Sequence, residues 1–233
     1  MLQHTKKMHT HFNNRTARNL PLGPLALLSQ AALGQGESLK TDLVSYWPLD
    51  VVEGNKTPDL ASGYDFTLVN MDDGDLITGK FGSAFNFKKV NKAHLVRTHE
   101  ANDDLPANKN TSFTIAFWTR TTGMGQQDLR LFSEGNGATG TPLFTLGSDN
   151  TAAGSNSLDI YIRQPPSAES GHLKTAALPL DGLDWHHIAF VQDLQADGTS
   201  TRQVYIDGTL DTLVIPNKAA DQIFDLNITS VGA

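Results

Sequence analysis

The feature that most constrains this chain is a run of alternating side chains at residues 112–120. Phe113, Ile115 and Phe117 would lie on one side of an extended segment, and a more mixed set of residues would lie on the other. A period of two is typical of a β-strand that covers an apolar core. No segment longer than about ten residues keeps the apolar spacing of a helix. The alternation therefore predicts an all-β protein.

Two further segments predict strands that pair with this one. Residues 185–191 alternate in the same way, and residues 202–210 contain the pair Asp207-Gly208. Asp-Gly is common in two-residue hairpin turns because both positions tolerate a positive φ angle. We expect these segments to form the centre of an antiparallel sheet.

Shorter alternating stretches are separated by turns rich in Gly, Pro, Asn and Asp, as in proteins built from many short strands. Strands are expected at residues 43–49, 64–70, 83–87, 93–97, 129–133, 143–146, 157–163 and 172–177. Together they predict a two-sheet antiparallel jelly-roll sandwich.

Five motifs, taken in order, carry a resemblance to a known family. They are YWPLD at 46–50, GKFGSAF at 79–85, the strand at 112–118, WHHIA at 185–189 and VYIDG at 204–208. In this order and spacing the chain resembles the laminin-G-like branch of the concanavalin A-like lectin/glucanase superfamily. The resemblance implies a jelly-roll fold, and it implies much less about activity, because one fold hosts many functions.

The first part of the chain, residues 1–40, is expected to be a signal-like or disordered leader. Its basic start is followed by a short apolar run at 20–28 and by small residues at 31–34. This order is typical of a secretory signal and favours an exported protein, extracellular or in the cell envelope. Two prolines in the apolar run disfavour a helix, so a disordered tail remains the alternative.

The second part, residues 41–233, is expected to form one laminin-G-like jelly-roll domain. Residues 227–233 resemble the penultimate part of the family pattern, after which another strand normally follows. We therefore expect the domain to lack its last strand, which would leave a sheet edge open to another chain. Alternatively, the first strand finds its neighbour elsewhere in this chain.

Charge and composition narrow the range of partners. The formal net charge is −7, there is no cysteine, and the first 35 residues contain basic side chains but no acidic ones. An acidic body of this kind disfavours nucleic acid and anionic membranes, and it favours neutral ligands or bound cations. No stretch reaches the length of a membrane span. The basic residues of the leader are Lys6, Lys7, Arg15 and Arg18.

The sequence offers no catalytic pair. Glucanases of the resembled superfamily carry Glu-x-Asp-x-x-Glu on one strand, and that spacing does not occur in this chain. His186 and His187 are adjacent on a strand and would point to opposite faces, so they cannot chelate one ion together. The resemblance implies a packing role for Trp185 and His187. We expect no catalytic residues.

Two acidic turns are candidates for a structural calcium ion. Carboxylates on loops are the oxygen ligands that Ca²⁺ prefers, and laminin-G-like domains often carry one such ion. The alternative is that these turns are simply solvated. The candidate metal ligands are Asp72, Asp73 and Asp75 in the first turn, and Asp103 and Asp104 in the second.

A sugar-binding surface needs an aromatic ring with polar groups beside it. The candidate ligand-binding residues are Trp118, Tyr161, Arg163 and Gln164, and the alternative for Trp118 is packing beneath the second sheet. The preferred function is non-catalytic carbohydrate binding by an exported lectin-like module. The alternatives are a protein-interaction or adhesion module of a larger surface protein, a polysaccharide hydrolase or lyase, and a truncated remnant.

Overall fold

The computed structural model describes most of the chain beyond the leader. The described residues are 41–100, 102–123, 127–138, 141–151, 155–162, 172–215, 218–219 and 226–232. The predicted leader at 1–40 lies outside them. Val44–Ala233 form one compact unit. Within the described residues all regular structure is β-strand or short 3₁₀ helix, and no helix is long and apolar enough to cross a membrane.

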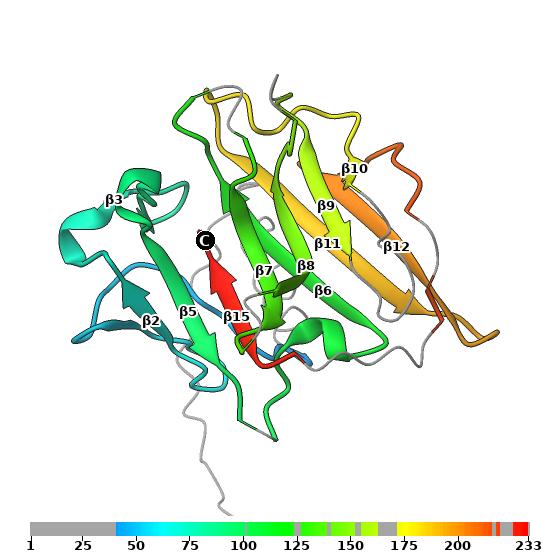
Figure 1. The fold of residues 1–233 in the computed structure, drawn as a ribbon, viewed down its shortest axis with the longest axis horizontal. Coiled ribbons are helices and arrows are strands. Elements are labelled where there is room, and N and C mark those ends of the chain that lie inside the picture. Colours follow the sequence, from blue (N-terminus) through cyan, green and yellow to red (C-terminus); the bar gives the residue numbers. More distant parts are fainter. Residues whose placement is uncertain are drawn as a thin grey trace, which may run out of the picture. The chain divides into compact units, whose positions relative to one another are not determined.

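The larger of the two main sheets has eight antiparallel strands in the order β1-β2-β5-β15-β7-β8-β9-β10 (Figure 1). Its strands are β1 (Lys56–Thr57), β2 (Phe66–Val69), β5 (His94–Thr98), β7 (Arg130–Asn136), β8 (Thr141–Ser148), β9 (Leu158–Ile162), β10 (His172–Lys174) and β15 (Ile228–Val231). The predicted all-β sandwich is confirmed.

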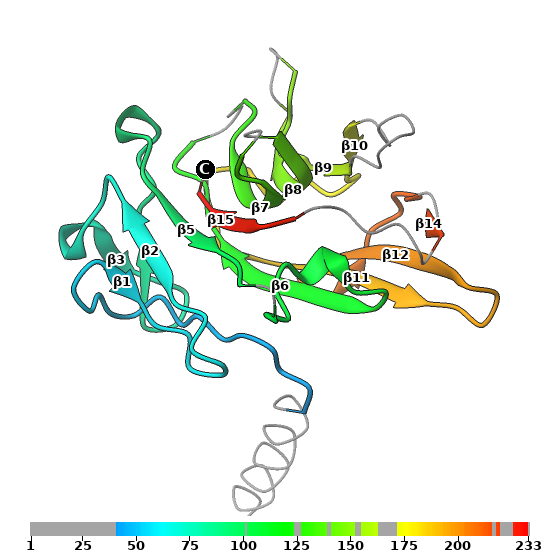
Figure 2. The ribbon, with the colours of Figure 1, turned by 60° about the horizontal axis from the view of Figure 1, so that its bottom comes forward.

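The smaller sheet has the order β13-β12-β11-β6, and β14 also pairs with β12. Figure 2 shows this sheet as a separate layer from β7, β8 and β9. Its strands are β6 (Phe113–Thr119), β11 (His186–Leu194), β12 (Thr199–Ile206), β13 (Thr209–Leu210) and β14 (Lys218–Ala219). The remaining elements are the hairpin β3 (Leu76–Thr78) and β4 (Ser83–Phe85), and the 3₁₀ helices η1 (Asp73–Asp75), η2 (Lys89–Asn91) and η3 (Ala107–Lys109).

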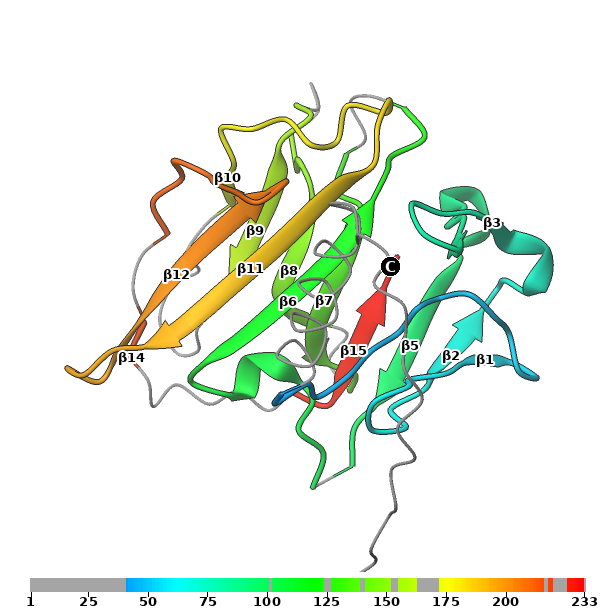
Figure 3. The same ribbon diagram turned by 180° about the vertical axis from the view of Figure 1, so that it is seen from behind.

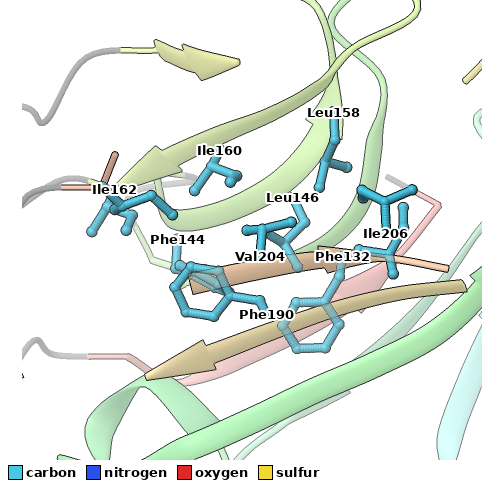
Figure 4. Packing of buried hydrophobic residues seen from close by; sticks show 11 residues of the cluster. Phe132, Phe144, Leu146, Leu158, Ile160, Ile162, Phe190, Val204 and Ile206 are labelled. Carbon is cyan, nitrogen blue, oxygen red and sulfur yellow. The ribbon is translucent and has the colours of Figure 1, made fainter. Parts of the chain in front are cut away.

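The core lies between the two sheets, where their apolar faces meet (Figure 4). The rings of Phe144 in β8 and Phe190 in β11 are 5.0 Å apart, and both side chains are fully buried. Each such side chain stabilises the fold by about 1.5–3 kcal/mol relative to exposure. The other buried members are Phe132, Leu146, Leu158, Ile160, Ile162, Ile188, Val204, Ile206 and Ile215.

The same alternation decides which side chains point away from the core. Ile160 and Ile162 face inward from β9, so Tyr161 between them faces outward from the large sheet. Ile115 and Phe117 of β6 pack against the core, so Trp118 faces outward from the small sheet. Figure 3 views the molecule from the side of β6, β11 and β12. Trp118 and Tyr161 therefore lie on opposite outer faces.

The predicted first strand at 43–49 is wrong, because this segment forms no ladder. Pro48 has no N–H to donate, and Leu49 adopts a positive φ of 61°, which ends an extended run. Instead the segment is held by the turn after β1. The N–H of Tyr46 donates to Asp59 Oδ1 at 2.7 Å, and the N–H of Leu60 donates to the carbonyl of Tyr46 at 2.8 Å.

The last described strand lies inside the large sheet. Strand β15 pairs with β5 on one side and with β7 on the other, so Thr229 lies opposite both Arg97 and Glu134. Strand β15 therefore connects the part of the large sheet formed by β1, β2 and β5 to the part formed by β7, β8, β9 and β10. On the small sheet, β6 pairs with β11 and has no second neighbour among the described strands.

Candidate functional site

Trp118 is the predicted ligand-binding residue that the structure exposes most clearly. Its side chain is 39 % exposed near the end of β6. Directly across the ladder lies His187 of β11, whose ring centre is 5.2 Å from that of Trp118. As predicted, His187 and its neighbour His186 make different contacts, because His186 lies against Asp207 with Nδ1 2.7 Å from Oδ2.

The hairpin β3–β4 adds two exposed side chains to Trp118. The ring of Phe81 meets the Trp118 ring edge to face, with centres 5.7 Å apart, and Phe81 is 72 % exposed. Lys80 places its Nζ 5.1 Å from the centre of the Trp118 ring. Such a cation over an indole is a favourable but weak contact at an exposed site. In the sequence, Lys80 and Phe81 belong to the motif GKFGSAF, and nothing in that motif predicted their contact with Trp118.

The turn that carries Lys80 and Phe81 is held by Asp50. Gly82 has a φ of +57°, and a Cβ atom on it would lie 2.3 Å from Asp50 Oδ1. The same oxygen accepts a hydrogen bond from the N–H of Ser83 at 2.6 Å. A glycine is therefore required for the carboxylate to approach the turn. Asp50 of the YWPLD motif thereby positions the GKFG motif.

A second cation and indole pair extends the surface past the end of β6. The guanidinium carbon of Arg120 lies 5.1 Å from the centre of the Trp185 ring, and Trp185 directly precedes β11. Arg120 is exposed. We call this surface the aromatic platform, and its members are Lys80, Phe81, Trp118, Arg120, Trp185 and His187.

The outer face of the large sheet carries a different cluster around Tyr161. The Tyr161 ring lies 4.8 Å from that of His172, and His172 Nδ1 is 3.0 Å from Asp159 Oδ2. Next to them, Lys174 Nζ lies 2.5 Å from Asp149 Oδ1. Tyr161 and Trp118 thus do not share a surface, and the predicted partners Arg163 and Gln164 lie outside the described residues.

The two carboxylates of this cluster, Asp149 and Asp159, are both buried, but their pKa values shift in opposite directions. Burial would raise the pKa of Asp149, but hydrogen bonds from Lys174, Ser155 and Thr151 outweigh it and hold that pKa well below its usual range. Burial raises the pKa of Asp159 despite the opposing effect of His172. Their charges are therefore largely balanced within the protein.

The first predicted calcium turn is occupied by contacts of its own. Asp72 caps η1 by accepting the N–H of Gly74, whereas Asp75 is paired with Lys88 Nζ at 2.6 Å. Lys88 and the backbone of Asp72 lower the pKa of Asp75. Asp73 lies exposed within η1. A calcium ion would have to displace the lysine.

The second predicted calcium turn has the same property. Asp103 forms an ion pair with Arg97, which itself lies over the ring of Tyr64, and Asp104 follows it in the turn. Among the described side chains, no three His, Asp or Glu residues are arranged to hold a metal ion. Asp75 and Asp103 are thus paired with protein cations, and the calcium site stays a prediction.

A buried polar network beneath η3 was missed altogether. Glu134 is 1 % exposed and accepts the N–H groups of Ala107 and Asn108 at 2.6 and 2.9 Å. Burial raises its pKa to about 7. His99 Nε2 lies 2.8 Å from Thr229 Oγ1, and burial lowers the pKa of His99 to about 4. Glu134 lies two residues after Phe132 on the same strand, and this spacing was the only feature of the sequence that indicated its burial. An outside ligand cannot reach these groups.

Three solved structures are similar to this chain, and the first of them supports the fold. The binding domain of botulinum neurotoxin DC in complex with SialylT is 14 % identical, with a TM-score of 0.53 over 82 % of this chain and 44 % of that one. The CBM40 module of Ruminococcus gnavus IT-sialidase, bound to α2,3-sialyllactose, is 16 % identical, with a TM-score of 0.44 over 60 % and 73 %. Bacillus licheniformis β-glucanase is 12 % identical, with a TM-score of 0.39 over 82 % and 87 %.

These identities are low, so the likeness concerns the fold alone. The chain spans less than half of the neurotoxin chain that it matches. None of the curated protein sequences matches this chain. A laminin-G-type family model, described as the concanavalin A-like lectin/glucanases superfamily, matches residues 94–221. Since that match covers more than half of the chain, the protein belongs to the laminin-G-like family of the concanavalin A-like lectin/glucanases superfamily.

Proposed function

We propose that this protein is a non-catalytic carbohydrate-binding module whose ligand lies on the aromatic platform. The observation that carries the proposal is the exposed pair Trp118 and Phe81. Their ring centres are 5.7 Å apart on the outside of the small sheet. Large exposed rings lose apolar contact with water when the C–H face of a sugar covers them. Exposed apolar groups gathered in one place, with polar groups around them, are typical of ligand-binding surfaces.

Polar groups next to the rings can fix the orientation of a sugar. The Lys80 ammonium and the Arg120 guanidinium are donors, and the imidazole of His187 lies beside Trp118. A few directional groups beside an apolar surface are what ligand sites use for specificity. The platform thus combines both requirements on one face.

Two carboxylates that contact residues of the platform or its supporting turn already have partners within the protein, which supports binding without turnover. Asp50 is committed to the turn of the β3–β4 hairpin, and Asp207 accepts the N–H of His187 at 2.8 Å while it also contacts His186. The contact with His186 lowers the pKa of Asp207, so it is a poor proton donor at neutral pH. The proposal includes export of the module, supported by the order of basic, apolar and small residues in the leader.

A glycan array followed by calorimetry on the best oligosaccharide tests the proposal. We expect Trp118→Ala to weaken binding by about five- to thirtyfold, because stacking on one ring contributes about 1–2 kcal/mol. Tyr161→Ala is the control, since Tyr161 lies on the opposite outer face, and it should change the affinity less than about twofold. Loss of binding in the Tyr161 variant but not in the Trp118 variant would refute the assignment.

A second candidate function is a protein-interaction or adhesion module, and the edge of β6 is the observation that favours it. Residues 113–119 contain no charge and no proline, and charges and prolines are the usual means of protecting an edge strand. Such an edge accepts a strand from another protein. A pull-down that captures a partner, together with an array that captures no glycan, would favour this function over the first.

A further inference from the structure

The platform carries two positive charges, one over each of its tryptophan rings. Lys80 and Arg120 are exposed, and neither forms an ion pair in the described part of the chain. Each is placed over a tryptophan ring, Trp118 for Lys80 and Trp185 for Arg120. The cations are therefore held at the rings on which a sugar would stack.

Three acidic residues near this surface make their contacts with groups other than Lys80 and Arg120. The carboxylate of Asp50 is used by the N–H of Ser83, and that of Asp207 by His186 and His187. Asp181 accepts the N–H of Leu183 and lies 3.7 Å from His186 Nε2, on the other side of β11 from the platform. Asp184 is exposed and directly precedes Trp185 in the chain, so its charge would oppose an anion bound near that ring.

A cation over an exposed indole is held by only about 0.5–1 kcal/mol, so it can turn toward an anion without a large cost. A charge-assisted hydrogen bond to a carboxylate or sulfate is about twice as strong as a neutral one. The guanidinium of Arg120 can also present two parallel donors to such a group. A sugar that covers Trp118 would bring an acidic substituent within the reach of these donors.

We infer that the ligand of the aromatic platform is an acidic glycan, bearing carboxylate or sulfate groups, which Lys80 and Arg120 select. The inference depends on the proposed carbohydrate-binding function and adds the class of ligand. It also reverses the expectation of a neutral ligand, which rested on the net charge of −7. Charges farther than about 10 Å from a ligand are screened at ordinary salt, so the local cations decide.

The experiment measures binding of matched oligosaccharides by calorimetry. One pair is a uronic acid oligosaccharide and its methyl ester, and the other is a sulfated galactan oligosaccharide and its desulfated form. We expect at least one acidic form to bind about tenfold more tightly than its neutral partner at about 50 mM salt, with most of the difference lost near 500 mM. The pair that shows the difference identifies carboxylate or sulfate as the group recognised.

Substitutions test whether Lys80 and Arg120 cause the preference for the acidic form. The double variant Lys80→Gln and Arg120→Gln should remove the preference, so that the acidic and neutral forms bind with affinities within about threefold of each other. Lys89→Gln, an exposed lysine on η2, is the matched control and should keep the preference. Asp184→Asn should strengthen binding of the acidic form.

The outcomes separate the two proposals. Equal binding of acidic and neutral forms overturns the acidic-ligand inference and leaves the carbohydrate-binding function standing. A preference that survives in the double variant, or disappears in Lys89→Gln, also overturns the inference. If none of the four oligosaccharides nor any array glycan binds, both proposals are wrong.

Discussion

The two outer faces of the sandwich each place an aromatic ring beside a histidine, yet they treat charge in opposite ways. Tyr161 and His172 lie among carboxylates that protein cations already neutralise, as in the contact of Asp149 with Lys174. Trp118 and His187 lie beside cations that contact rings and no described carboxylate. The charges around Tyr161 are paired within the protein, whereas the cations beside Trp118 are available to bind a ligand.

The contrast shows that what a polar group contributes depends on burial and on its partner. A buried charge needs a partner to avoid a desolvation cost, so Asp149 with Lys174 serves stability. An exposed charge such as that of Lys80 costs little when unpaired and can serve recognition. Glu134 is the intermediate case, buried and bonded to N–H groups but to no cation.

The largest effect expected concerns Glu134. Its pKa is raised from 4.5 to about 7, so the folded state keeps a proton that the unfolded state releases. Its contribution to stability is full below about pH 4.5 and is lost as the pH rises to about 7, a loss on the order of 3 kcal/mol. Glu134→Gln should remove this loss, and urea unfolding at pH 5 and pH 8 measures it.

His99, in the same buried network, makes stability change with pH in the opposite direction. Its lowered pKa makes the folded state release a proton that the unfolded state keeps, so stability rises between about pH 4 and 6.5. The wild-type profile therefore contains both effects, and only the difference between wild type and Glu134→Gln isolates the carboxyl group. A pH-independent difference would show that Glu134 is not protonated by burial.

The next effect compares a paired charge with an unpaired one. Asp149→Ala should lower the free energy of unfolding by about 2 kcal/mol, because it leaves Lys174 and two backbone N–H groups without their acceptor. Lys80→Ala, on the platform, should change it by less than about 0.5 kcal/mol. Denaturant unfolding at pH 7 gives both values, and similar losses for the two variants would end the distinction between the faces.

The smallest effect concerns the turn that positions Lys80 and Phe81. Gly82→Ala should cost about 1–2 kcal/mol from its positive φ, and should also weaken glycan binding severalfold because the new Cβ pushes the turn away from Asp50. Gly63→Ala is the control, since Gly63 has a φ of +74° and open space around it. It should share the stability cost and keep the affinity. Equal affinities for the two variants would show that the hairpin does not shape the platform.

Much of the fold could be predicted because burial imposes a period of two on each strand. Phe113, Ile115 and Phe117 indicated their strand and its inward face directly. The segment at 43–49 looked equally strand-like, but pairing needs a neighbour at the right distance, which a local pattern does not contain. Strand β4 lies within the predicted strand at 83–87, whereas its partner β3 was missed because it has three residues, two of them exposed.

The candidate site was predicted less completely. Trp118 was identified as a large ring on the mixed face of a strand, and its contact with His187 follows from strand register. Lys80 and Phe81 are distant in the sequence and reach Trp118 only through a hairpin held by Asp50. Nothing local to Tyr161 indicated that it would face away from Trp118.

The sequence by itself determined an all-β sandwich, its main strands and its family, because side-chain alternation and turn residues are local properties. Only the tertiary structure decided which rings share a face and which charges are matched. Those properties depend on the order of strands in each sheet and on contacts between residues far apart in the chain. Phe81 with Trp118, and Asp149 with Lys174, are pairs of this kind.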